Sequence, residues 1–495
     1  MKKLSFFAAC ICALALGSCV KDADVQSSDS ILSDVGGNTS FTFTIQDADD
    51  SASSRSITDG TVEDSGVHDQ GEAEEYAVNN VDIYLFDSSS EILVQTFSLQ
   101  GLKLSNETSD DLIVRYESDK FYVDAGSYNI FAVANSSSIY DVTTQTQFLA
   151  YEDVTYKENS LMTVIPTEGF IMTNRASENQ NVIISANEDV EINITLERVV
   201  VKVDVSQKLD DYSLTDDSGN TYAIVQLHNY MMVNLATSYY LFRHVADLTT
   251  FSVPTFTYTV NFGAVSDTDG YVIDPYFFSK DSASIESFDN SDGFFFQQLQ
   301  EVETSPTWSM MPSSSSSSVN YCLENTMYQD AQLNGYTTGI VFQGKVIPTS
   351  IITDAVGGTT SSNLPMIYYC NGKFYNSIAT LEDCIGNIPS IDDSSSTADL
   401  EAANIIRFTL TNNDYPCYYN YWIKHYDNND AKVMGVMEFG VVRNNYYKLS
   451  ITSVGGLGTG EPTVHNPNPD ESSETLLVDL DVSSWIVRDQ GSIEL

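Results

Sequence analysis

The stretch TLLVDLDVSSWIV, residues 475–487, alternates apolar and polar side chains near the end of the chain. A period of two is typical of a β-strand with one buried face. The apolar positions are Leu476, Val478, Leu480 and Val482, followed by Trp485, Ile486 and Val487. A terminal strand either completes its own sheet or adds to the sheet edge of a neighbouring molecule. The pattern therefore predicts a strand and leaves both roles open.

The composition indicates that the rest of the chain is also rich in strands. With 495 residues the chain is too long for a single core, so we expect two domains. The 29 Tyr and 24 Phe favour strands over helices, and we predict a mostly β fold. Asp and Glu number 69 against 22 Lys and Arg, which gives a net charge of −47. Such a surface repels phosphate backbones and excludes nucleic acid as a partner.

The first residues form an export signal. Lys2 and Lys3 precede an apolar run over residues 4–16, which is too short to span a bilayer. Small residues then lead to Cys19, the pattern of a bacterial lipoprotein signal. We expect residues 1–18 to be removed, Cys19 to carry the lipid, and the polar residues 19–37 to act as a tether to the outer membrane.

A second amphipathic strand is predicted near the N-terminus, over about residues 40–46. Phe41, Phe43 and Ile45 share one face of it. A polar segment, residues 46–76, follows and contains Arg55, the only Lys or Arg between Lys21 and Lys103. A long connection of this kind is a candidate cleavage loop. A trypsin-like protease would cut it between Arg55 and Ser56.

Further strand patterns divide the chain into two domains. One apolar run ends near Glu197 and the next begins at Val199 without a turn signal, so we place the boundary there. The N-terminal domain is predicted over residues 38–197 and the C-terminal domain over residues 198–455. Residues 456–495 are predicted as a Gly/Pro-rich linker, which frees the last strand from the domain body, and that strand itself.

The sequence contains no pattern of catalytic chemistry. It lacks the serine-hydrolase, phosphate-loop and zinc-protease motifs, and its five histidines have no ligand spacing. We therefore expect no enzyme activity, no catalytic residues, no metal site and no cofactor. Four cysteines remain after the signal, and their spacing leaves free thiols and disulfides equally open. They are Cys322, Cys370, Cys384 and Cys417.

Several motifs, in their order and spacing, resemble the type V fimbrillins, the shaft subunits of fimbriae in anaerobic Gram-negative bacteria. The resemblance is strongest to the shaft protein of the short, minor-type fimbriae. It spans nearly the whole chain apart from residues 210–404. The motifs are VDIYLF at 81–86, IFAVAN at 130–135, LERV at 196–199, GVVRNNYYKL at 440–449 and VSSW at 482–485.

The resemblance implies two tandem β-sandwich domains of the transthyretin-like type with few short helices. It also implies that an arginine-specific or trypsin-like surface protease cuts after Arg55 and releases the strand containing Phe41, Phe43 and Ile45. The C-terminal strand of another copy, around residues 476–487, then fills the groove. The donor has more apolar side chains, each worth roughly 1.5–3 kcal/mol when buried, so we expect it to replace the first strand.

The implied product is a head-to-tail fimbrial shaft at the cell surface that mediates adhesion and biofilm formation. Its partners would be further copies of the chain, tip and anchor proteins, and a surface ligand of unknown identity. Two alternatives stay open. One is an accessory tip or anchor subunit, and the other is a glycan-binding surface lipoprotein that uses Trp308 and Trp422.

Overall fold

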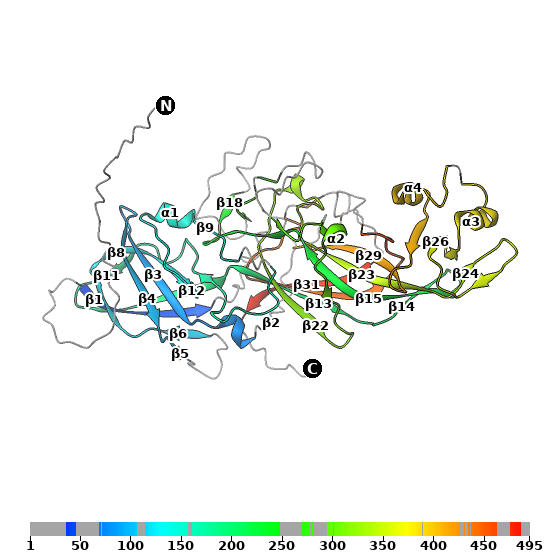
Figure 1. Cartoon of the computed structure of the whole chain (residues 1–495). Coiled ribbons are helices and arrows are strands. Elements are labelled where there is room, and N and C mark those ends of the chain that lie inside the picture. Colours follow the sequence, from blue (N-terminus) through cyan, green and yellow to red (C-terminus); the bar gives the residue numbers. More distant parts are fainter. Residues whose placement is uncertain are drawn as a thin grey trace, which may run out of the picture.

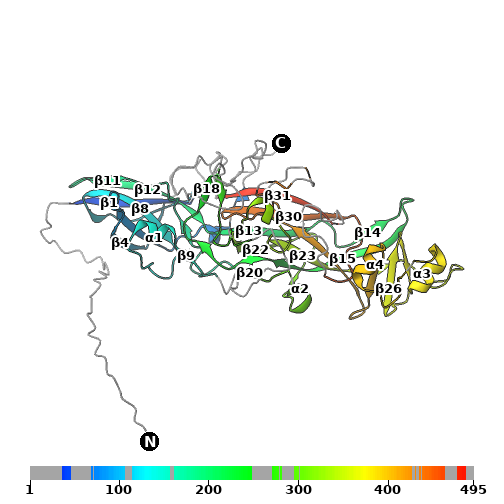
Figure 2. The same cartoon turned by 90° about the horizontal axis from the view of Figure 1, so that it is seen from above.

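The computed structural model confirms a mostly β chain with few short helices (Figure 1). The molecule is elongated, with β1 (Gly36–Ile45) near one end and α3 (Ile378–Ile385) near the other (Figure 1 and Figure 2). The structure describes residues 36–45, 69–70, 72–105, 114–156, 161–247, 270–277, 279–280, 295–299, 301–388, 390–425, 430, 434–435, 437–462 and 476–486.

Ten strands of the N-terminal half form one sheet. Besides β1, they are β3 (Asn80–Asp87), β4 (Leu93–Gln100), β5 (Lys103–Ser105), β6 (Arg115–Glu117), β7 (Phe121–Asp124), β8 (Gly126–Ala134), β10 (Met172–Thr173), β11 (Val182–Ile184) and β12 (Asp189–Arg198). The order is β4-β3-β8-β10-β12-β1-β6-β5, with β11 beside β8 and β7 beside β1.

The predicted hairpin over residues 81–99 is present as β3 and β4. Asp87 closes its turn, because its Oδ1 accepts hydrogen bonds from the backbone N–H groups of Ser89 and Ser90 at 3.2 and 2.8 Å. Both faces of β3 are buried. Ile83 packs in one apolar cluster with β1 and β12, whereas Tyr84 packs in a second cluster that reaches the C-terminal half.

Two five-stranded sheets of the C-terminal half share one core. The first consists, in order, of β2 (Asp69–Gln70), β31 (Leu476–Ile486), β30 (Asn445–Val454), β13 (Val200–Gln207) and β22 (Ser317–Leu323). The second consists of β14 (Tyr212–Thr215), β15 (Thr221–Val233), β23 (Gly339–Pro348) and β29 (Tyr415–Trp422), with β21 (Ser309–Met310) beside β15. Val203 and Leu449 of the first sheet share a buried cluster with Val225 and Phe342 of the second. The two sheets therefore pack face to face.

A small unit at the far end of the molecule has its own sheet and core (Figure 1). Its strands are β24 (Ile351–Ile352), β25 (Thr359–Thr360), β26 (Met366–Cys370), β27 (Lys373–Tyr375) and β28 (Ile406–Thr409), and its helices are α3 and α4 (Thr397–Ala402). Ser377 and Ser396 cap the two helices with their hydroxyl oxygens. The sequence predicted strands here within the C-terminal domain but not a separate unit.

Near Glu197, where the sequence predicts a domain boundary, β12 ends at Arg198 and β13 begins at Val200. The two halves are not separated by a flexible linker, since Phe131 of β8 and Phe242 of the C-terminal half pack edge to face at 5.1 Å. The remaining elements are η1 (Ala73–Tyr76), α1 (Gln145–Leu149), β9 (Glu152–Asp153), β16 (Leu235–Ala236), β17 (Tyr239–Tyr240), β18 (Val245–Asp247), β19 (Gly270–Val272), β20 (Phe295–Phe296), α2 (Glu301–Thr304) and η6 (Gln329–Ala331).

Candidate functional site

Strand β1 lies inside the N-terminal sheet with a paired strand on each side (Figure 1). It runs parallel to β12, in register from Asn38 opposite Asp189 to Ile45 opposite Leu196. On its other side it runs antiparallel to β7 and then to β6. The predicted first strand is therefore present, and it begins at Gly36 rather than Ser40. Removal of β1 would leave a slot with unpaired backbone on two sides.

The aromatic side chains of β1 fill the core of the N-terminal sheet. Phe41 and Phe43 are both fully buried. Their rings stack at 6.0 Å, and the Phe41 ring also stacks on Phe121 at 5.5 Å. The third predicted position, Ile45, pairs through its backbone with Leu196, and its side chain lies outside the described residues. The face predicted to be buried is thus confirmed for both phenylalanines.

Strand β31 pairs with its own domain. It lies antiparallel to β30, with Tyr447 opposite Val482 and Leu449 opposite Leu480. On its other side only the short β2 pairs with it, in parallel, with Asp69 opposite Trp485 and Gln70 opposite Ile486. The strand predicted over residues 476–486 is confirmed, whereas Val487 lies outside the described residues. β31 is therefore close to being an edge strand, whereas β1 is a central one.

The end of the predicted cleavage loop is ordered, which differs from the prediction of an unanchored segment over residues 46–76. Glu75 of η1 is fully buried. Its Oε1 pairs with Lys202 Nζ at 2.7 Å and accepts a hydrogen bond from the Tyr321 hydroxyl at 2.5 Å. Its backbone carbonyl accepts from Arg198 Nε at 2.7 Å. The Glu75 carboxylate therefore fixes the loop end to β13 and β22 of the C-terminal half, and its backbone carbonyl fixes it to the end of β12. In the sequence Glu75 is only one more acidic residue.

The predicted linker is partly packed on the domain body, which corrects the prediction that it leaves the last strand free. Leu457 is buried, and Thr459 forms a backbone bridge with Tyr418 of β29. A Cβ atom at Gly458 would lie 2.2 Å from the Tyr418 carbonyl oxygen, and one at Gly460 would lie 1.8 Å from the Arg407 carbonyl oxygen. These two glycines thus allow close backbone packing. Residues 463–475 lie outside the described part of the chain.

The predicted lipidation and cleavage residues, Cys19, Arg55 and Ser56, also lie outside the described residues. The structure places β1, β31 and the end of the loop at residues 69–70 and 72–76.

Two motifs noted in the sequence meet at the junction of the domains. Arg198 is fully buried, and its Nη1 donates to Asn444 Oδ1 at 3.1 Å. The neighbouring Arg443 is also buried and makes a bidentate pair with Glu324, with its Nε 2.8 Å from Oε2. Burial lowers the pKa of Arg198 to about 10, against the opposing effect of Glu75. Sequence reasoning found both arginines but not Glu324, because a buried carboxylate has no local signature.

Two family matches cover most of the chain. Residues 34–281 match the family described as fimbrillin-A associated anchor proteins Mfa1 and Mfa2. Residues 413–491 match the family described as major fimbrial subunit protein type IV, fimbrillin, C-terminal. The chain belongs to the type V fimbrillins. It is a fimbrial protein of the cell surface, and the first match spans both β1 and the domain boundary.

Solved structures similar to this fimbrillin come from Parabacteroides distasonis and Porphyromonas gingivalis. A putative cell adhesion protein from Parabacteroides distasonis is 12% identical, with 91% of this chain and 100% of that chain covered and a TM-score of 0.43. A fimbrilin from Porphyromonas gingivalis is 12% identical, with 92% and 99% covered and a TM-score of 0.40. The tip fimbrial protein Mfa3 from the same species is 11% identical, with 90% and 100% covered and a TM-score of 0.35. No curated protein sequence matches the chain.

The two tryptophans proposed for glycan binding do not form an exposed platform. Trp422 is buried in an apolar cluster, and Gly339 lies against it so closely that a Cβ atom there would be 2.4 Å from the indole ring. Trp308 is half-buried and packs on the same cluster. Trp422 is therefore a core residue, and Trp308 packs against the same core.

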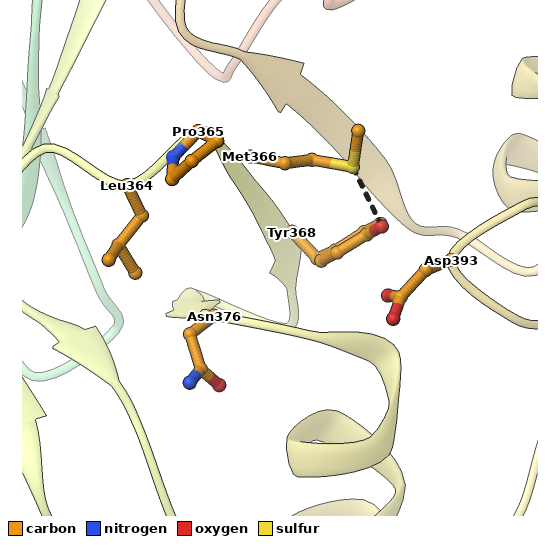
Figure 3. A pocket seen from close by; sticks show the side chains of 6 residues that line it. All are labelled: Leu364, Pro365, Met366, Tyr368, Asn376 and Asp393. Carbon is orange, nitrogen blue, oxygen red and sulfur yellow. Dashed lines mark hydrogen bonds between the residues drawn. The ribbon is translucent and has the colours of Figure 1, made fainter.

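An open pocket of about 370 Å³ lies in the small unit at the far end of the molecule, the distal unit formed by β24–β28, α3 and α4 (Figure 3). Leu364, Met366 and Asn376 line it together with Tyr368 and Asp393. Asp393 is already used within the unit, because its Oδ1 accepts a hydrogen bond from the Ile378 backbone N–H at 2.9 Å. The pocket therefore lies beside β26 and the segment that leads into α3.

The four cysteines in the described part of the chain are free thiols, which answers the question the sequence left open. Cys322 and Cys417 are fully buried, and burial raises the pKa of both to about 12. They are inert core residues. Within the described part of the chain, no cluster of three His, Cys, Asp or Glu could hold a metal ion. None of the helices described is long and apolar enough to cross a membrane.

Proposed function

We propose that this fimbrillin is a shaft subunit that polymerises by protease-triggered strand exchange. The precursor is exported as a lipoprotein carrying its lipid on Cys19. A trypsin-like or arginine-specific protease cuts between Arg55 and Ser56, and β1 leaves with the lipid. β31 of another copy then occupies the slot.

The observation that carries this proposal is the position of β1. A strand that follows a tether at the N-terminus is paired on both sides and contributes Phe41 and Phe43 to the core. Its loss would leave both unpaired backbone and unfilled apolar space, which only another strand of similar pattern can satisfy. β31 fits this requirement in length, with 11 residues against 10 in β1.

The pairing of β31 supports its role as the donor. In the monomer it is covered along one edge by β30 and along the other edge only at Trp485 and Ile486 by β2. It can separate from the domain without breaking a two-sided ladder. Because donor and acceptor surfaces are different, the contact is head-to-tail and extends into a filament. Partners of the polymer would be tip and anchor subunits.

Replacement of Arg55 tests the proposal. Arg55→Ala should give a full-length, lipid-bearing protein at the outer membrane and no filaments, as judged by electron microscopy and by the mass of the surface protein. In the wild type, N-terminal sequencing should find a start at Ser56. The matched control is Ser54→Ala, which should polymerise normally. Filaments of normal length from Arg55→Ala would show that the cleavage site is wrong.

An accessory anchor role is the second candidate, and the match of residues 34–281 to a family described by its anchor proteins favours it. An anchor would stay lipidated and lie at the base of the fimbrium. Immunogold labelling separates the two, because a shaft subunit is labelled along the whole filament and an anchor only at one end.

A further inference from the structure

Three polar side chains are buried together in the C-terminal domain, apart from both terminal strands. Asp274 follows β19, Lys280 lies six residues later, and Asn325 follows β22. Asp274 and Lys280 are each 1% exposed, and Asn325 is 0% exposed. A lysine is almost never buried this completely without a specific partner.

The lysine amine contacts both the acid and the amide. Lys280 Nζ lies 2.6 Å from Asp274 Oδ2 and 2.8 Å from Asn325 Oδ1, and it also donates to the Thr326 carbonyl at 2.6 Å. Because a C=O bond is about 1.2 Å long, the Asn325 carbonyl carbon lies about 3–4 Å from Nζ. This is near the separation at which a nucleophile attacks a carbonyl group.

The orientation of the Asn325 amide is set by its surroundings. Its Nδ2 donates to the Tyr336 carbonyl at 2.7 Å, to the Thr338 hydroxyl at 2.9 Å and to the Asn234 carbonyl at 3.2 Å. These groups accept hydrogen bonds, so the NH₂ group must face them and the carbonyl group must face Lys280. The amide nitrogen therefore lies in a cradle of acceptors on the side away from the amine.

Burial shifts the amine toward its neutral, nucleophilic form. Val272, Phe277 and Phe295 belong to the apolar cluster beside the three groups. Lys280 Nζ lies 5.9 Å from the centre of the Phe295 ring. Burial lowers the pKa of Lys280, although Asp274 acts in the opposite direction. A desolvated lysine of this kind is activated for attack.

We propose that Lys280 and Asn325 form an intramolecular isopeptide bond, with Asp274 as the general base. The Nζ–Cγ bond forms and the Cγ–Nδ2 bond breaks. Of the two protons that Nζ loses, one moves to Asp274, which becomes a neutral carboxylic acid. The other reaches Nδ2, which leaves as ammonia. No oxidant or co-reactant is needed, and the protonated Asp274 remains hydrogen-bonded to the new amide.

Such a bond would join Lys280 covalently to Asn325, just after the end of β22. The chain between these two residues would then form a closed loop. A noncovalent ion pair would explain the contact between Lys280 and Asp274. An ion pair alone, however, gives no reason for the carbonyl group of Asn325 to face the amine while its NH₂ group is held on the far side.

Tryptic mapping of the full chain tests the proposal, because Lys280 is the only trypsin site between Arg243 and Lys345. After denaturation, an unlinked chain should give peptides 244–280 and 281–345. The linked chain should instead give one peptide, 244–345, lighter than its sequence mass by one ammonia. Fragmentation should then locate the branch at residues 280 and 325. Complete recovery of the two separate peptides from the wild type would overturn the proposal.

Three variants separate this bond from other losses of ammonia. Lys280→Arg keeps the cation and the trypsin site but removes the nucleophile, so it should give the two separate peptides at full mass. Asn325→Ala should do the same. Asp274→Asn should reduce the linked fraction at least tenfold. Loss of ammonia from the peptide containing Asn325 in Lys280→Arg would indicate a cyclised asparagine and would also overturn the proposal.

Discussion

The two strands nearest the chain ends, β1 and β31, are held in opposite ways. β1 is a central strand whose edges are both paired and whose Phe41 and Phe43 are fully buried. β31 is paired along its length by β30 only, and β2 covers two of its residues. The strand proposed to leave is thus the more firmly held, and the strand proposed to donate is the more easily separated.

This difference changes the physical account of the exchange. The sequence suggested that β1 is weak because it has fewer apolar side chains than the donor. The stacked rings of Phe41, Phe43 and Phe121 instead make it a substantial part of the core. Cleavage alone therefore would not empty the slot quickly. We expect the donor to displace β1 gradually along the groove, so that the ladder is never fully unpaired.

A charged residue on the apolar face of β31 gives the largest expected effect. Leu480→Asp should abolish filament growth, because burying a carboxylate in an apolar groove costs several kcal/mol. Ser483→Asp, on the other parity, should polymerise like the wild type. Filament length by electron microscopy measures both.

Mixing the Leu480→Asp chain with wild-type chain tests whether the mutant is still folded. Its own slot is intact, so cleaved mutant should accept β31 from the wild type and then fail to donate. Equal amounts of mutant and wild type should therefore give markedly shorter filaments than wild type alone. If the filaments in the mixture keep their wild-type length and the mutant alone grows normal filaments, β31 is not the donor strand.

Both terminal strands were predictable from sequence because each follows a clear period of two next to a polar segment. The same rule found the β3–β4 hairpin. For β31 the pattern could not decide between its own sheet and a neighbour's, since both use the same alternation. In the described structure it pairs in its own sheet.

What sequence could not predict depends on partners that are distant in the chain. Glu75 is one of three glutamates between residues 72 and 75, and only its contacts with Lys202 and Tyr321 distinguish it. Gly458 and Gly460 suggested a free linker, because flexibility and close backbone packing select the same residue. The distal unit was missed because its strands are only two to five residues long.

Glu75 also bears on how firmly the two terminal strands are held, because it fixes the end of the loop that would remain after β1 has left. Glu75→Gln leaves the buried Lys202 without its counter-charge and should lower the free energy of unfolding by about 3–5 kcal/mol. Urea unfolding of the full chain measures this. The neighbouring exposed Glu74→Gln is the matched control and should change stability by less than about 0.5 kcal/mol.

A double variant tests whether the loss at Glu75 is electrostatic. Glu75→Gln combined with Lys202→Met removes both charges, so it should recover at least half of the stability lost by Glu75→Gln alone. If the stability losses of the single variants Glu75→Gln and Lys202→Met simply add in the double variant, Glu75 acts through packing rather than through the ion pair. The loop end is then not held by charge.

The smallest predicted effect concerns the junction between the two halves and its dependence on pH. His244 is buried, stacks on Tyr240 with ring centres 3.6 Å apart, and its Nε2 donates to the Leu149 carbonyl of α1 at 2.7 Å. Burial, assisted by the nearby charge of Arg443, lowers its pKa from 6.5 to about 4, although the Leu149 carbonyl favours the charged form. The folded protein therefore holds His244 neutral at pH values where the unfolded chain is protonated.

Stability contributed by this histidine is fully present above pH 6.5 and should fall by about 3 kcal/mol as the pH drops from 6.5 to about 4. His244→Gln keeps a donor for the Leu149 carbonyl but cannot titrate. The difference in unfolding free energy between wild type and variant should therefore depend on pH only in this window. If the difference in unfolding free energy stays constant from pH 7 to pH 4, His244 is solvated in the folded protein. The junction between the N-terminal and C-terminal halves then opens more readily than its buried side chains imply.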